Sequence, residues 1–331
     1  MKTKIVYVLV SSPLDIYLEQ AYVSMHSLRH YMPDVNITLI TDRLTAETFT
    51  EIREKETKYV NEMIVVDLDE NSFTPQQRSR QLKTSIRNRV EGDFLYIDCD
   101  TIIVKPLDDI DNITAPLAAC RDTHSSFANN PYRKMCINHG HLLGWPIDKE
   151  YEYFNGGVTY AKDCQEAKDF YQRWNHNLNM GYKYGVYMDQ PSFAKTNYEM
   201  GHIIEHLPDI WNCQLKHGIR YLKDAHIVHY LCTNPSVFQN KQLFLLNEKD
   251  VFLSIKRTGE ISEEIEEVIK DPFKGLAEVT HCFAGDDIYF FHTDSYKYLR
   301  SRYKMGENSL QDKWLLFLKS IGYYKNRLLG R

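Results

Sequence analysis

The stretch GDFLYIDCDTIIVKPL, residues 92–107, decides the fold because an apolar run in it ends at two carboxylates, Asp98 and Asp100. Residues two apart on a strand point to the same side, so both carboxylates can face one point beyond the sheet edge. Hard oxygen ligands suit Mg²⁺ or Mn²⁺ and leave coordination positions open for a diphosphate. The pattern therefore predicts a divalent-metal site at a strand end, with two solvated acids as the alternative.

The segments before this stretch alternate between two kinds of element. Short apolar runs at 4–11, 36–41 and 62–66 are separated by helical patterns, including 14–31 and a basic one near 76–90. Such alternation predicts an α/β fold with a Rossmann-like, mostly parallel mixed sheet flanked by helices. Ligands bind at the carboxyl ends of the strands in sheets of this kind, which is where the acidic pair lies.

The composition excludes several classes of protein. The chain has 331 residues, 43% of them hydrophobic, and a net charge of −5, with no domain-wide excess of Lys and Arg that would indicate nucleic-acid binding. Its seven cysteines stand singly, which predicts neither a zinc cluster nor a disulfide framework and favours a reducing, cytoplasmic location. We find no run of about 18 apolar residues that would span a membrane.

Further polar groups occur at chemically informative positions. His226 and His229 are three apart, so on a strand they face opposite ways and only one can join the acidic pair. The Asn155-Gly156-Gly157 segment predicts a turn that lets a ligand approach the backbone closely. The Asp189-Gln190 pair precedes a proline and is expected at a helix start, where Asp189 either caps the helix or contacts a ligand.

Basic residues line the helical pattern before the acidic pair. Three of them follow helical spacing and are expected on one face, within reach of phosphates: Arg80, Lys83 and Arg87. The others, Arg78 and Arg89, are expected to be solvated.

Four ordered blocks resemble glycosyltransferase family 8, the retaining glycosyltransferases related to glycogenin and the bacterial lipooligosaccharide galactosyltransferase. Residues 92–107 resemble its Asp-x-Asp block, 153–158 its Phe-Asn-Ser-Gly-Val block, 188–191 its Asp-Gln block, and 225–230 the strand of its third metal ligand. The likeness spans about residues 4–235. It implies a GT-A fold.

The resemblance also implies roles for residues at matching positions. The implied ligands of Mn²⁺ (or Mg²⁺) are Asp98, Asp100 and His229. The implied catalytic pair at the anomeric centre of the sugar is Asp189 and Gln190. The expected contacts to base, ribose, phosphates and sugar are Leu9, Ser11, Tyr17, Arg80, Lys83, Asp98, Asn155, Gly156 and Gly157, with Lys83 preferred over Arg80 as the basic group.

The match departs from the family after His229. The family continues into a Gly and a Lys-Pro-Trp segment, whereas residues 231–235 here read Leu-Cys-Thr-Asn-Pro. The lysine that would contact the diphosphate is therefore not found there.

The implied activity is transfer of a hexose from a UDP-sugar to a hydroxyl acceptor with retention of configuration, the acceptor being a carbohydrate or glycolipid such as a surface glycan or lipooligosaccharide. Two alternatives stay open. A haloacid-dehalogenase-like phosphatase shares a strand ending in Asp-x-Asp, and residues 284–287 imitate its later acidic motif, although its nucleophile follows the first strand. A non-catalytic sugar-nucleotide binding protein is the other.

The expected organisation is a GT-A domain at 1–245, with a nucleotide-binding half at 1–115 and an acceptor-side half at 116–245, because no Gly/Ser/Pro-rich linker interrupts it. A helical extension at 246–331 follows, and its tail from 313 is basic and amphipathic. This tail either packs on the core or makes peripheral contact with the inner face of a membrane.

Overall fold

The computed structural model describes residues 1–69, 71–147, 150–231, 243–277, 293–296, 314 and 317. The chain divides into two units, Met1–Ala277 and Glu278–Arg331. The segment at 231–235, where a lysine was expected, lies outside the described residues except for Leu231. The acidic motif at 284–287 lies wholly outside them. So does the basic tail, apart from Trp314 and Phe317, whose exposed rings meet edge-on with centroids 5.7 Å apart.

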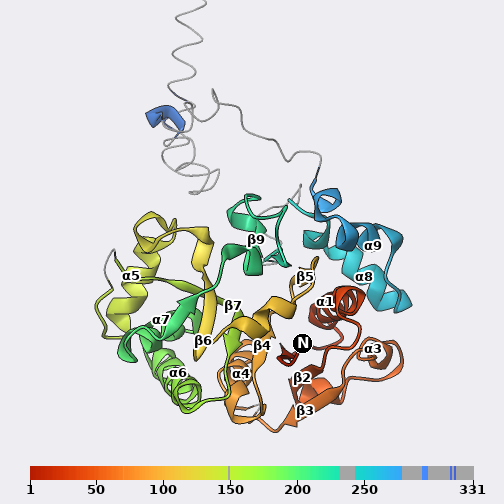
Figure 1. Ribbon diagram of the computed structural model, residues 1–331, viewed down its shortest axis with the longest axis horizontal. Helices are drawn as coiled ribbons and strands as arrows, with labels where there is room; N and C mark the ends of the chain where they lie inside the picture. The colour runs from red at the N-terminus through yellow and green to blue at the C-terminus, as the bar shows by residue number, and fades with distance from the viewer. Residues whose placement is uncertain are drawn as a thin grey trace, which may run out of the picture. The chain divides into compact units, whose positions relative to one another are not determined.

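A seven-stranded sheet forms the centre of the first unit, with the order β3-β2-β1-β4-β7-β6-β8 (Figure 1). Its strands are β1 (Lys4–Leu9), β2 (Ile37–Asp42), β3 (Glu62–Val66), β4 (Phe94–Ile97), β6 (Leu117–Arg121), β7 (Phe154–Ala161) and β8 (Ile204–His206). The pairs β3–β2, β2–β1, β1–β4 and β6–β8 are parallel, whereas β7 is antiparallel to both β4 and β6. The predicted mostly parallel, mixed sheet is confirmed.

A second sheet of three short strands, β5 (Thr101–Ile103), β10 (Ile227–His229) and β9 (Cys213–Gln214), continues the chain beyond the acidic pair. β10 runs antiparallel to β5, and the register sets His229 opposite Thr101. β10 also runs parallel to β9, with His229 opposite Gln214. This register brings residues that are far apart in sequence to the end of β4.

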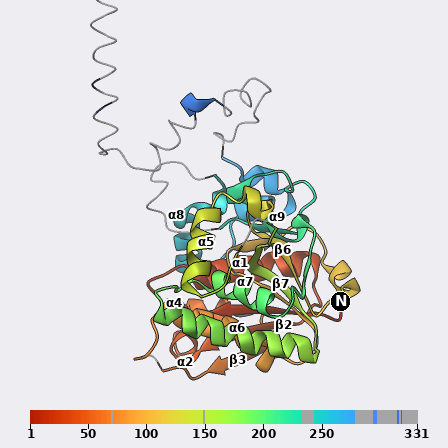
Figure 2. The ribbon, with the colours of Figure 1, turned by 90° about the vertical axis from the view of Figure 1, so that its left-hand side faces the viewer.

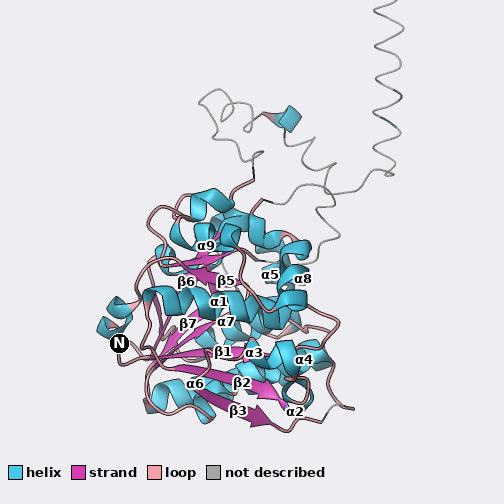
Figure 3. Ribbon diagram, turned by 90° about the vertical axis from the view of Figure 1, so that its right-hand side faces the viewer, coloured by secondary structure: helices cyan, strands magenta, loops and turns pink. Residues whose placement is uncertain are grey.

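Helices cover both faces of the main sheet, as Figure 3 shows for α1 and α6. They are α1 (Tyr17–Tyr31), α2 (Arg43–Ala46), α3 (Glu51–Lys55), α4 (Pro75–Lys83), α5 (Arg133–Leu142), α6 (Gln165–Lys183), α7 (Asp189–Glu199), α8 (Lys249–Thr258) and α9 (Glu263–Lys270). Successive β1 side chains point to opposite faces. Tyr7 packs in the core beside α1, whereas Val8 packs in the core beside α4 and α6, which lie together in Figure 2.

The helices α8 and α9 belong to the first unit. Phe252 and Ile255 of α8 share a hydrophobic cluster with Tyr22 and Val23 of α1. The predicted boundary at residue 245 stays a prediction, but these contacts show that residues 249–270 complete the cover over α1.

Two local expectations are wrong. The Asn155-Gly156-Gly157 segment is not a turn, because it lies within β7, where all three residues are buried. The basic helix ends earlier than expected, since α4 stops at Lys83 and Arg87 follows in a separate 3₁₀ turn.

Five described cysteines are free thiols. Among the described residues, we find no helix of the length and apolarity needed to cross a membrane.

Candidate functional site

The two carboxylates and His229 converge at the carboxyl end of β4. One ligand atom from each of Asp98, Asp100 and His229 lies within 4.8 Å of the others, and Nε2 of His229 is 3.1 Å from Oδ1 of Asp100. His226 turns elsewhere, because its ring stacks on Trp211 and its Nδ1 contacts the carbonyl oxygen of Pro106. Two carboxylates and an imidazole form a donor set that Mn²⁺ or Mg²⁺ fits.

Gly157 has no side chain, and the Asp98 and His229 side chains occupy the space where its Cβ would lie. The backbone N–H of Asp98 donates to the Gly157 carbonyl at 2.8 Å, which holds β7 directly against the acidic pair. A Cβ at position 157 would lie 2.5 Å from Cε1 of His229 and 2.7 Å from Oδ2 of Asp98. Only glycine fits there, so the glycine serves close approach between the two ligands and a strand.

A buried group of charges adjoins the cluster. The Lys83 ammonium lies 3.3 Å from Oδ1 of Asp98 and 3.0 Å from Oδ2 of Asp189, so it joins the acidic pair to the start of α7. Arg80 is 3.8 Å from the other oxygen of Asp189. The phenol of Tyr96 donates to Asp98 and its ring faces Lys83 at 4.8 Å. Asp189 is the first residue of α7, next to the N-cap residue Met188, and its side chain serves these ion pairs.

Burial and charge act against one another in this group. Burial alone would lower the pKa of Lys83, but Asp189 and Asp98 raise it above its usual value, so the amine stays charged. Burial would likewise raise the pKa of Asp189, but Lys83 and Arg80 hold it below its usual range. The pKa of Asp98 is raised, chiefly by burial and against the pull of Lys83. For His229, burial is outweighed by Asp100, and the pKa is raised.

A hydrogen-bond network built around two amide side chains lies behind the cluster, and the sequence pattern missed most of it. Nδ1 of His229 is 3.0 Å from Oδ1 of Asn212, whose Nδ2 donates to Oδ1 of Asn155 at 3.0 Å. Asn155 Nδ2 donates to Asp122 at 3.2 Å and reaches Oε1 of Gln190 at 3.5 Å. Asn212 and Asp122 belong to no recognisable motif, because each lies in a 3₁₀ turn whose partners come from distant strands.

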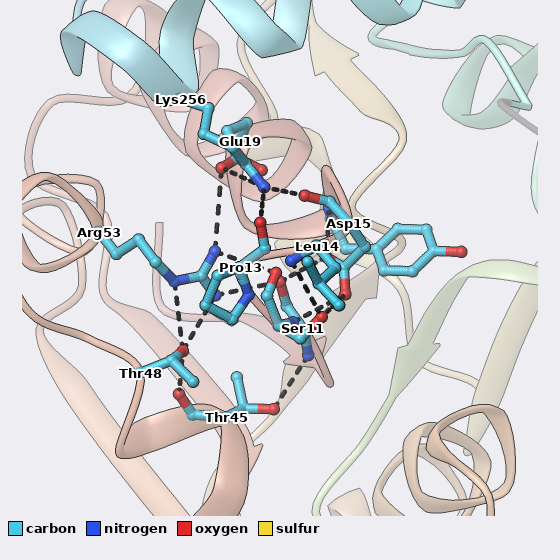
Figure 4. A network of polar contacts seen from close by, with 11 residues as sticks. Ser11, Pro13, Leu14, Asp15, Glu19, Thr45, Thr48, Arg53 and Lys256 are labelled. Carbon is cyan, nitrogen blue, oxygen red and sulfur yellow. Dashed lines mark hydrogen bonds and ion pairs between the residues drawn. The ribbon is translucent and has the colours of Figure 1, made fainter.

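The predicted residues after β1 lie in a different environment. Leu9 is buried in the core beside α1, and its carbonyl accepts a hydrogen bond from Thr41. Ser11 donates to Asp15 and accepts from Arg53, as Figure 4 shows. Tyr17 is exposed at the first turn of α1. Their contact with a nucleotide stays a prediction.

The β1–α1 loop is braced from α8, a feature that the sequence did not predict. The Lys256 ammonium donates to the carbonyls of Pro13 and Asp15 and lies 3.3 Å from Oε1 of Glu19 (Figure 4). Arg53 of α3 donates to the carbonyl of Ser12. Two helices thus hold the loop that follows the carboxyl end of β1.

Arg87 does not join the site. It is buried, its guanidinium donates to the carbonyls of Gly92 and Val90, and it lies over the ring of Phe94. The expectation that it reaches phosphates is wrong, because the helix ends at Lys83 and no longer sets its direction. Arg78 is also buried, paired with Asp42 at 2.6 Å, and is not the solvated residue expected.

No model of a known protein family matches the sequence, and no curated protein matches it either. Solved structures do. The fold is similar to that of the galactosyltransferase LgtC with donor and acceptor sugar analogues, at 12% identity and a TM-score of 0.54, over 80% of this chain and 99% of that one. It is also similar to the glycosyltransferase GlyE of Streptococcus pneumoniae TIGR4, at 17% identity and a TM-score of 0.51, over 85% and 67%. These likenesses establish the GT-A fold.

Proposed function

We propose that this protein is a metal-dependent glycosyltransferase that moves a hexose from a UDP-sugar to a hydroxyl acceptor with retention of configuration. The observation that carries the proposal is the convergence of Asp98, Asp100 and His229 at the carboxyl end of β4 in a GT-A fold. The fold likeness does not favour the phosphatase alternative. A surface glycan or lipooligosaccharide is the proposed acceptor.

The metal site would be formed by Asp98, Asp100 and His229, which suit Mn²⁺ or Mg²⁺. A bound ion of this kind supplies Lewis-acid stabilisation of a departing diphosphate. Lys83 adds a buried positive charge 3.3 Å from Asp98, where an anionic donor would lie. This position offers a cationic group in place of the lysine that the segment after His229 lacks.

The sugar would lie between the metal cluster and the start of α7. Asn155 and Gln190 provide amide groups there, 3.5 Å apart. Asp189 is held by Lys83 and Arg80, which supports a positioning task for it rather than attack on the sugar. We therefore assign front-face transfer, in which Gln190 stabilises the positive charge that develops at the anomeric carbon.

The test is a donor panel of UDP-glucose, UDP-galactose and their N-acetyl forms with Mn²⁺, scored by UDP release. At least one donor is expected to be turned over by the wild type, and the Asp98→Asn variant should lose more than about 100-fold of that rate, because a metal ligand is gone. Loss of phosphomonoester hydrolysis in the same variant, with no UDP released by the wild type, would instead point to a phosphatase.

Gln190 has a separate test once a donor and an acceptor are known. The Gln190→Ala variant is expected to lower kcat with little change in KM, because the proposed contact strengthens only in the transition state. Full turnover at saturating donor and acceptor would contradict this role.

A further inference from the structure

A chain of hydrogen bonds, in which each donor and acceptor can be assigned, links the backbone of β7 to His229. We propose that Asn212 is a positioning residue that holds His229 in the tautomer whose Nε2 lone pair faces the metal site. This inference rests on the proposed function for the identity of that site.

The backbone of Gly157 fixes the orientation of the Asn155 amide. The backbone N–H of Gly157 lies 2.9 Å from one side-chain atom of Asn155, and a backbone N–H can only donate. That atom must therefore be the carbonyl oxygen, Oδ1. The amide nitrogen then faces the carboxylate of Asp122 at 3.2 Å, which can only accept while it is ionised. Both ends of the Asn155 amide thus agree on one orientation.

Asn155 in turn fixes the orientation of the Asn212 amide. Its side chain meets the same Oδ1 of Asn155 at 3.0 Å, and an acceptor there requires a donor, which must be Nδ2 of Asn212. Oδ1 of Asn212 is consequently turned to Nδ1 of His229, 3.0 Å away. Amide orientations are often ambiguous from shape alone, but here a main-chain donor settles both of them.

Asn212 then fixes the tautomer of His229. Because Oδ1 of Asn212 carries no hydrogen, the proton of this hydrogen bond belongs to Nδ1 of the imidazole. In the neutral ring Nε2 then carries a lone pair and no hydrogen. This nitrogen lies 3.1 Å from Oδ1 of Asp100, within the cluster that also contains Asp98. A metal-binding histidine commonly has its free ring N–H held in this way, which orients the ring and raises its basicity.

Burial makes the chain of bonds hard to replace with water. Asn212 is fully buried and His229 is 2% exposed. The opposite tautomer would set the Nδ1 lone pair against the Oδ1 lone pairs and leave a buried acceptor unsatisfied, which is unfavourable. The register also supports the pairing, since Asn212 directly precedes β9, whose Cys213 and Gln214 pair with Val228 and His229.

The experiment compares Asn212→Ala with Asn212→Asp and with Asn177→Ala. The aspartate keeps an acceptor for Nδ1 of His229 but loses the donor to Asn155. Asn177 is equally buried but hydrogen-bonds Thr196 and Glu199 between α6 and α7, so it controls for the general loss of a buried amide. Two quantities are measured: the His229 tautomer by ¹⁵N NMR of the metal-free protein at alkaline pH, assigned with His229→Gln, and the Mn²⁺ dissociation constant by EPR.

We expect wild type and Asn212→Asp to carry the proton on Nδ1, and Asn212→Ala to show a mixture of tautomers. Asn212→Ala should bind Mn²⁺ about 10–100-fold more weakly. Asn212→Asp should recover most of that loss, whereas Asn177→Ala should bind as the wild type does. If the alanine variant does not fold, the aspartate variant and the wild-type tautomer still decide the question.

A wild-type proton on Nε2, or undiminished Mn²⁺ affinity in a folded Asn212→Ala, overturns the proposal. A loss in Asn177→Ala as large as in Asn212→Ala also overturns it, because the effect is then not specific. The proposed function fails separately. If the wild type carries the Nδ1 proton yet binds no Mn²⁺, metal dependence fails and the assigned tautomer stands.

Discussion

Two buried polar clusters support the same carboxyl edge of the sheet by different physical means. The metal-side network consists of Asp122, Asn155, Asn212 and His229, and the loop brace consists of Glu19, Arg53, Glu56 and Lys256. The metal-side network is held by hydrogen bonds with one direction. In the loop brace, Glu19 and Glu56 are both 0% exposed, and among the described residues their four carboxylate oxygens have no hydrogen-bond partner.

The two clusters differ in how their interactions depend on pH. The two amide side chains of the metal-side network, Asn155 and Asn212, do not titrate. The loop brace depends on ion pairs, in which Lys256 and Arg53 lie 3.3 and 3.9 Å from Glu19. Burial, assisted by Glu19, raises the pKa of Glu56 to about 7. We infer that the metal-side network fixes the orientation of its side chains, whereas the stability that the loop brace contributes depends on pH.

The largest expected effect comes from filling the space beside the metal-side network. Gly157→Ala places a Cβ 2.5 Å from His229, and Mn²⁺ affinity measured by EPR should fall by about 100-fold or more, since the ligands must move apart. Gly156→Ala is the matched control, because its nearest neighbour would be 3.7 Å away, at the end of the Lys83 side chain. Equal Mn²⁺ binding by the two variants would refute the packing argument.

A smaller effect is expected from breaking the loop brace. Lys256→Met removes the nearer ion-pair partner of the buried Glu19 and leaves Arg53, at 3.9 Å, as its partner in this cluster. Because a buried carboxylate then loses a compensating charge, the free energy of unfolding should fall by about 2 kcal/mol. Urea unfolding measures this change. Lys249→Met, at the exposed start of the same helix, controls for the loss of a lysine and should alter stability little. A loss in both variants of the same size would show that the brace contributes nothing specific.

The smallest effect is a pH dependence. The pKa of Glu56 in the folded protein is about 7 against a usual 4.5, so the folded state binds the proton more tightly. Its contribution to stability is therefore fully present below pH 4.5 and is lost as the pH rises through 7. Glu56→Gln removes this titration, and relative to wild type its free energy of unfolding should rise by about 1 kcal/mol between pH 6 and pH 8.

Urea unfolding at both pH values checks this gain. Glu54→Gln, an exposed neighbour on α3, should show no such change. A constant difference between Glu56→Gln and wild type across the range would mean that Glu56 does not titrate there.

Sequence patterns located the parts of the site that depend on near neighbours. The apolar run before Asp98 predicted β4, and the spacing of two predicted that Asp98 and Asp100 face one site, whereas His229 was implied only by the family resemblance. The proline after Gln190 predicted the start of α7. In each case the information lies within a few residues, because strand and helix periodicity are local properties.

Local patterns failed where a distant partner decides the outcome. Two glycines suggested a turn, yet pairing with β4 and β6 draws them into β7. Arg87 followed the helical spacing of Lys83, yet it is turned away because the helix ends before it. The backbone preference of a short segment is weak, and the contacts of neighbouring strands outweigh it.

The sequence by itself determined the alternation of strands and helices, the acidic pair at a strand end and the charge needed near it, since these follow from periodicity and side-chain chemistry. The tertiary structure alone decided that Asn212 meets Asn155 across 57 residues and that Lys256 braces the loop after β1. The physical reason is that strand register and helix packing, rather than local spacing, set which distant polar groups share a buried space and must satisfy one another.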